Sequence, residues 1–126
     1  MNGAGDAGEG VKPPWDADGG LEVGVAEVAE ALAAGQRFRL IDCREEDEHA
    51  ICRLQGAELM PLGNLVASGF KSLTDVKEVV VVYCHHGMRS GRAVELLRAR
   101  GCPLAFSMAG GIDLWSLAVD PGVARY

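Results

Sequence analysis

A run of four valines at residues 79–82, closed by Tyr83, most constrains how this chain can fold. Side chains on both faces of this run are apolar, which is typical of a central strand in a parallel sheet. The polar segment CHHGMRS at residues 84–90 follows directly, and residues 91–100 have the periodicity of an amphipathic helix. The pattern therefore places a single cysteine, Cys84, in a tight turn at the carboxyl end of a buried strand.

The position of Cys84 predicts a reactive thiol. Backbone N–H groups of the turn and of the helix start are expected to point at its sulfur. Such a ring of donors favours negative charge, so it lowers the pKa of the thiol and favours a nucleophile at neutral pH. The alternative is a buried structural thiol, which the polar His-His-Gly sequence of the turn does not favour.

Apolar and amphipathic segments alternate along the rest of the chain. Strands are predicted at residues 21–23, 38–41, 56–60, 79–83 and 104–106. Helices are predicted at residues 25–32, 45–51, 62–70, 91–100 and 112–117. This order predicts an α/β fold with a central, mostly parallel five-stranded sheet flanked by helices. Ligands of such sheets bind beyond the carboxyl ends of the strands, where Asp42 and Cys84 are expected.

Length and charge narrow the class of protein. The 126 residues fit one domain, and we predict a flexible tail at residues 1–20 followed by the domain at residues 21–126. The net charge of −6 argues against nucleic acid or an anionic membrane as partner. The chain shows no membrane-spanning apolar run and no secretory signal at its N-terminus, and its four cysteines form no CxxC pair. We therefore expect reduced thiols and a cytoplasmic protein.

Five sequence blocks follow one another along the chain, at residues 40–45, 51–61, 80–90, 91–101 and 109–115. In this order they resemble the single-domain rhodaneses, a family of sulfurtransferases. The first, LIDCRE, is similar to the family's IDVRE block, the third resembles its active-site strand and loop, and the last is similar to its closing GG-x-x-x-W. The chain thus resembles a rhodanese over residues 21–126.

This resemblance implies a rhodanese-like three-layer fold and a sulfurtransferase activity. Cys84 would be the catalytic residue and would carry sulfur as a persulfide, without a cofactor or a metal. Asp42 and Arg44 would brace the loop. The partners would be a small-molecule sulfur donor such as thiosulfate and an acceptor, either cyanide, a thiol or a sulfur-carrier protein. The substrate-binding residues would be His85, His86, Gly87, Met88, Arg89 and Ser90.

Four residues separate Cys84 from Arg89, whereas related dual-specificity phosphatases have one more in this loop. A persulfide sulfur is one atom and fits a narrower cradle than a tetrahedral phosphate, so the resemblance favours sulfur chemistry. The alternatives are a cysteine-based phosphatase or arsenate reductase on the same fold, and a non-catalytic interaction module. The loop is less basic than in some thiosulfate-specialised members, which leaves the physiological donor open.

Other polar residues near the predicted site have simpler interpretations. Cys43 stands where the family often has valine, and we interpret it as a small apolar residue; the alternative is a resolving thiol for the Cys84 persulfide. His49 and the acidic residues 45–48 are expected to be solvated. Ser90 is expected to cap the following helix or to face the sulfur. The two histidines of the turn are expected to line the site entrance rather than to bind zinc.

Overall fold

The computed structural model of the protein describes residues 10–73 and 77–126. The strands in these residues are β1 (Glu22–Val23), β2 (Arg39–Asp42), β3 (Glu58–Leu59), β4 (Val80–Tyr83) and β5 (Ala105–Met108). They form one five-stranded sheet in the order β1-β5-β4-β2-β3, and all the pairings between neighbours are parallel. The predicted α/β fold with a central parallel sheet is confirmed.

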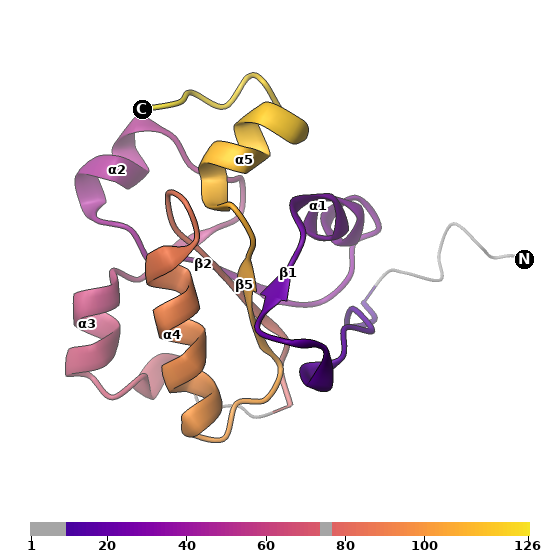
Figure 1. Cartoon of the computed structure of the whole chain (residues 1–126), viewed down its shortest axis with the longest axis vertical. Coiled ribbons are helices and arrows are strands. Elements are labelled where there is room, and N and C mark those ends of the chain that lie inside the picture. Colours follow the sequence, from indigo (N-terminus) through magenta and orange to yellow (C-terminus); the bar gives the residue numbers. More distant parts are fainter. Residues whose placement is uncertain (1–9, 74–76) are drawn as a thin grey trace, which may run out of the picture.

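Helices cover both faces of the sheet, which gives the three layers (Figure 1). These helices are α1 (Val25–Ala33), α2 (Glu46–Ile51), α3 (Leu62–Ala67), α4 (Met88–Ala99) and α5 (Gly111–Ala118). Helices α1 and α5 contact each other on one face, while α3 and α4 contact each other on the opposite face. Helix α2 connects β2 to β3.

The central strand β4 explains the continuous valine run. Val81 and Tyr83 belong to the apolar cluster under α1 and α5, whereas Val80, Val82 and Cys84 belong to the cluster under α3 and α4. All five are at most 3% exposed. Burial of a valine side chain stabilises a fold by roughly 1.5–3 kcal/mol relative to its exposure. Alternation along β4 therefore directs Cys84 toward α4, the helix that follows the loop.

Helix α4 begins at Met88, three residues earlier than predicted. The reason is Gly87, which has φ 107° and lets the chain turn from the loop directly into the helix. Arg89 and Ser90 consequently lie in the first helical turn. The helix predicted at residues 62–70 instead ends at Ala67.

Residues that precede β1 contact the domain. The Trp15 ring packs edge-on against Phe38 and Phe106, with centroid distances of 5.9 and 5.7 Å. The Arg98 guanidinium donates to the carbonyl oxygens of Ala17 at 3.0 Å and Gly20 at 2.8 Å. The predicted tail therefore includes a packed part, and residues 1–9 lie outside the described residues.

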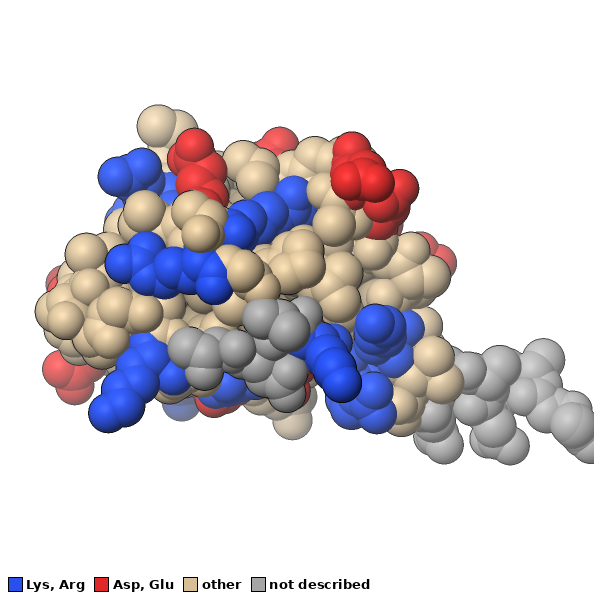
Figure 2. Space-filling view, turned by 90° about the horizontal axis from the view of Figure 1, so that it is seen from below, with Lys and Arg blue, Asp and Glu red and all other residues tan. Residues whose placement is uncertain are grey.

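Basic side chains gather at the end of the molecule where the strands begin (Figure 2). Exposed residues at this end include Lys71, Lys77 before β4, and Arg100 at the end of α4. The loop that begins at Cys84 follows β4 and lies at the opposite end of the sheet, beside α2 and α5 (Figure 1). The basic surface is thus remote from Cys84, so any anion site near the sulfur must be formed locally.

Candidate active site

The sulfur of Cys84 lies inside a ring of hydrogen-bond donors. The backbone amides of Gly87 and Ser90 donate to Sγ at 3.1 and 3.4 Å, and the Ser90 hydroxyl lies 3.5 Å from it. The side chain is buried, with 1% of Cys84 exposed. The strand, turn and helix therefore converge on one sulfur atom.

Helix α5 holds this loop in its shape. The amide of Ile112 donates to the carbonyl of Cys84 at 2.9 Å, and that of Asp113 donates to the carbonyl of His85 at 3.1 Å. The first turn of α5 thus engages the carbonyls of the loop, while amides further along the loop face the sulfur. Gly111 makes this approach possible, because it has φ 62° and an added Cβ would lie 2.4 Å from the His85 oxygen.

The pKa of Cys84 is lowered to about 4. The largest cause is the hydrogen-bonding interaction with the Cys43 thiol; burial opposes it, and the hydroxyl and amide of Ser90 and the amide of Gly87 lower the pKa further. A pKa this low makes Cys84 a thiolate at neutral pH, which is the nucleophilic form. The thiolate is stabilised mainly by neutral groups.

Ser90 faces the sulfur and does not cap the helix. Gly87 is the N-cap of α4, so the predicted capping role was wrong. The Ser90 hydroxyl lies 2.7 Å from the hydroxyl of Ser107 on β5 and 3.2 Å from the Gly87 carbonyl. These contacts fix the hydroxyl beside Cys84.

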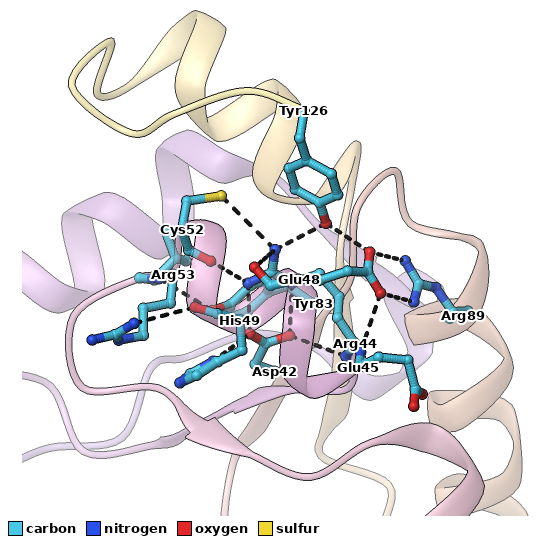
Figure 3. Close-up of polar contacts among 11 residues, drawn as sticks. Asp42, Arg44, Glu45, Glu48, His49, Cys52, Arg53, Tyr83, Arg89 and Tyr126 are labelled. Atoms are coloured by element: carbon cyan, nitrogen blue, oxygen red, sulfur yellow. Dashed lines mark hydrogen bonds and ion pairs between the residues drawn. The ribbon is translucent and has the colours of Figure 1, made fainter.

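Arg89 forms a bidentate ion pair with Glu48 of α2 (Figure 3). The Nη1–Oε1 and Nη2–Oε2 distances are 2.6 and 2.9 Å. The hydrogen bonds from Arg89 are the main reason that the pKa of Glu48 is lowered to about 2. This pair links the start of α4 to α2. It also means that the positive charge of Arg89 is already balanced.

Asp42 and Arg44 form a buried ion pair, here called the brace, at the carboxyl end of β2 (Figure 3). Both side chains are 0% exposed, and the Asp42 oxygens accept from Arg44 Nε at 2.9 Å and Nη2 at 2.7 Å. Arg44 also donates to the Cys52 carbonyl, and Asp42 accepts from the Tyr83 hydroxyl and contacts His49 Nδ1 at 2.8 Å. Burial alone would raise the pKa of Asp42, but hydrogen bonds from Arg44 and His49 lower it.

The expected solvation of His49 and Glu48 was wrong, since His49 contacts Asp42 and Glu48 pairs with Arg89. Tyr126, not assigned from the sequence, joins this cluster: its hydroxyl donates to Glu48 at 2.7 Å and accepts from Arg44 at 2.9 Å. One feature of the sequence could have indicated that Glu48 and His49 lie near the site. Helix α2 follows β2 at the carboxyl edge of the sheet, so one of its faces must turn toward the loops there.

The remaining residues of the loop contact Tyr126 or Asp113 or are exposed. His85 stacks on Tyr126 with a centroid distance of 3.9 Å and an interplanar angle of 8°. His86 is exposed, with its Nδ1 3.9 Å from Asp113, and Met88 is 84% exposed. Within residues 10–73 and 77–126, no group of three or more His, Cys, Asp or Glu side chains is placed to hold a metal ion. The groups of the loop that contact the sulfur are the amides of Gly87 and Ser90 and the Ser90 hydroxyl.

Comparison with known proteins agrees with this geometry. The family model of the rhodanese-like domain matches residues 25–118. The chain belongs to the rhodanese family. The matched span runs from the start of α1 to the end of α5 and includes the Cys84 loop and the Asp42–Arg44 brace.

Two curated proteins are similar to most of this chain. The uncharacterized protein YqhL of Bacillus subtilis is 37% identical over 87 residues, which is 68% of each chain. The probable adenylyltransferase/sulfurtransferase MoeZ of Mycobacterium tuberculosis is 31% identical over 102 residues, or 79% of this chain but 26% of MoeZ. The relatives of this chain thus include a protein named as a probable sulfurtransferase, and the present chain spans about a quarter of the length of MoeZ.

Solved structures show the same fold. The human single-domain sulfurtransferase TSTD1 has a TM-score of 0.69 and 28% identity over 79% of this chain and 98% of its own. A rhodanese-related protein from Thermoplasma volcanium has a TM-score of 0.70 and 26% identity over 83% of this chain and 98% of its own. These relatives support a sulfurtransferase family.

Among the described residues, no helix is both long and apolar enough to cross a membrane.

Proposed function

We propose that the protein is a sulfurtransferase that moves a sulfane sulfur through a persulfide on Cys84. The donor is a small molecule such as thiosulfate, and the acceptor is a thiophile: cyanide, a thiol or a sulfur-carrier protein. The observation that carries the proposal is the Cys84 sulfur, held by the amides of Gly87 and Ser90 in a loop with four residues between Cys84 and Arg89.

In the first step the Cys84 thiolate attacks the outer sulfur of thiosulfate. A bond forms between Sγ and that sulfur, the sulfur–sulfur bond of thiosulfate breaks, and sulfite leaves with the electron pair. The product is a persulfide anion on Cys84. Amide donors that already stabilise a thiolate can stabilise this anion without reorganisation, and one such donor in comparable oxyanion sites is worth about 3 kcal/mol.

In the second step the acceptor attacks the terminal sulfur of the persulfide. With cyanide, a carbon–sulfur bond forms, the persulfide bond breaks and thiocyanate leaves. The electron pair returns to Sγ, which restores the Cys84 thiolate. The two steps make a double displacement with a covalent intermediate.

Arg89 supports the site in two ways. Its pair with Glu48 ties the first turn of α4 to α2, which fixes the loop on the side that faces α2. Its guanidinium also supplies positive charge where an anionic donor would enter, since 35% of the side chain is exposed. Because Glu48 competes for that charge, an anionic donor gains less from Arg89 than it would from an uncompensated arginine.

The test measures thiocyanate formed from thiosulfate and cyanide, together with added sulfur on the tryptic peptide of residues 78–89. We expect turnover and one extra sulfur atom on this peptide. Cys84→Ser should abolish both and leave the thermal unfolding midpoint almost unchanged, because a hydroxyl cannot become a persulfide. Cys102→Ser, remote from the loop, is the control. Transfer by Cys84→Ser at the wild-type rate would contradict the proposal.

A further inference from the structure

A second cysteine lies directly beside the reactive one. Strands β2 and β4 are parallel neighbours in which Asp42 is paired with Tyr83, and the Cys43 amide donates to the Tyr83 carbonyl at 3.0 Å. Cys43 and Cys84 are the residues that directly follow these two strands. They are therefore opposite each other at the carboxyl edge of the sheet.

Both side chains point to the same face of the sheet. Cys43 and Cys84 belong to the apolar cluster under α3 and α4, and they are 0% and 1% exposed. Neighbouring strands lie about 4.8 Å apart, and a disulfide needs a Cα separation of about 4.4–6.8 Å. The Cα separation of such paired neighbours thus lies within the range for a disulfide, and both residues are reduced thiols.

The two thiols interact in the reduced protein. The hydrogen-bonding interaction that lowers the pKa of Cys84 raises that of Cys43, for which it is the largest cause. Cys43 therefore keeps its proton next to the Cys84 thiolate. A valine at this position would fill the same space but would provide neither the proton nor a second sulfur.

We propose that Cys43 is a resolving cysteine, whose sulfur attacks the inner sulfur of a Cys84 persulfide to form a Cys43–Cys84 disulfide and release hydrosulfide. The inference rests on the proposed function, because the persulfide is its starting point. It adds an outcome to the transfer cycle. In the absence of an acceptor, the protein releases its sulfur as hydrosulfide, and its nucleophilic thiol becomes part of a disulfide.

The step is balanced within the protein. The bond between Cys84 Sγ and the terminal sulfur breaks, and a bond between Cys43 Sγ and Cys84 Sγ forms. The terminal sulfur leaves with the electron pair and takes the proton of the Cys43 thiol, so the product is HS⁻. The sulfane sulfur is reduced by two electrons, the two cysteines are jointly oxidised by two, and no further oxidant is needed.

The donor ring suits this departure. The amides of Gly87 and Ser90 that stabilise negative charge on sulfur also stabilise the leaving hydrosulfide. The other two cysteines have different surroundings: Cys52 lies 3.9 Å from Arg44 Nη1, and Cys102 donates to the Leu73 carbonyl at 3.1 Å. The geometry therefore singles out Cys43 as the partner of Cys84.

The test loads the full chain with thiosulfate, removes the donor, and follows the protein without acceptor or oxygen. We expect the extra sulfur to disappear, one equivalent of sulfide to form, and a cross-link to join the tryptic peptides of residues 40–44 and 78–89. In Cys43→Val and Cys43→Ser the persulfide should persist at least about tenfold longer, because no internal thiol can displace it. Cys102→Ser should behave as the wild type.

The outcomes separate this inference from the proposed function. If the wild type and both Cys43 variants lose the persulfide at equal rates and no cross-link forms, the resolving role is overturned while the sulfurtransferase proposal stands. If neither the wild type nor the variants acquire sulfur from thiosulfate or inorganic polysulfide, the proposed function fails and the resolving role falls with it. The wild-type cross-link is measured without any variant, so the test does not depend on their folding.

Discussion

The carboxyl ends of β2 and β4 stabilise a buried negative charge in two different ways. Each of these strand ends carries a buried, negatively charged group: the carboxylate of Asp42, the last residue of β2, and the thiolate of Cys84, the residue after β4. Asp42 is compensated by the cation of Arg44 at 2.7 Å. Cys84 is compensated mainly by a neighbouring thiol, a hydroxyl and backbone amides.

This difference teaches why one loop is structural and the other is reactive. A carboxylate paired with a buried guanidinium has its electron pairs occupied, and separating the two charges is costly. Neutral dipoles stabilise the thiolate of Cys84 but leave it able to form a covalent bond. On the proposed mechanism the same donors would remain in place when the charge moves to a terminal sulfur, so one loop would stabilise both the thiolate and the persulfide.

The strongest way to break the comparison is Asp42→Asn. This change leaves Arg44 as a buried charge without its partner, so we expect a loss of about 3–5 kcal/mol in the free energy of unfolding. Urea denaturation measures it. The exposed pair Arg39–Glu58 is the matched control, since Glu58→Gln should cost less than about 1 kcal/mol. Equal losses for the two variants would show that burial of the brace is unimportant.

A second change acts on the Cys84 loop alone. In Gly111→Ala the new Cβ would lie 2.4 Å from the His85 carbonyl oxygen, so the loop must move away from α5. We expect kcat/KM for thiosulfate to fall by roughly ten- to a hundredfold, since a displacement of about 1 Å can cost that much. Gly63→Ala is the control, because nothing lies within 4 Å of its added Cβ. An unchanged kcat/KM in Gly111→Ala would mean that α5 does not shape the loop.

The pH dependence of alkylation sharpens the electrostatic part of the comparison. The pKa of Cys84 is lowered to about 4, and the thiolate is the reactive form above that pH. The rate of alkylation of Cys84 by iodoacetamide should therefore be constant from pH 8 to about 6 and fall tenfold per unit below about pH 4. In Cys43→Val the midpoint should move upward, because the largest stabilising interaction is lost. A midpoint near 8 in the wild type would contradict the donor ring.

The smallest effect concerns the ion pair between Arg89 and Glu48. Glu48→Gln removes the charge that balances Arg89, so the guanidinium should attract thiosulfate more strongly. We expect KM for thiosulfate to fall by about three- to fivefold, in line with the modest energy of partly exposed pairs. KM for an uncharged organic polysulfide should stay constant, and exposed Glu46→Gln is the control. A decrease of equal size for both donors would refute the charge effect.

The sequence predicted those features that short segments determine. The valine run, the turn glycine and the alternation of segments lie close together in the chain, and they were sufficient for the parallel sheet and for the position of Cys84. The start of α4 was misplaced, because the left-handed conformation of Gly87 replaces the expected serine cap. Local patterns alone do not show which of several polar residues closes a turn.

Contacts between distant segments could not be read from the sequence. Glu48 and Arg89 are separated by 41 positions, and Glu48 and Tyr126 by 78. Each of these residues also fits a solvated surface, so their association depends on the packing of α2 beside the loop. Cys43 shows the same limit: its position after β2 was evident, but its contact with Cys84 follows from the pairing register of two strands.

The support that α5 gives to the Cys84 loop has a consequence for biosynthesis. Ile112 and Asp113, whose amides bind the loop carbonyls, follow Cys84 by more than 25 residues along the chain. Domains emerge from the ribosome N-terminus first. A nascent polypeptide that has been translated only through α4 thus lacks the two amides that bind the loop carbonyls, and we expect the loop to reach its final shape only after the later segment is made and docks.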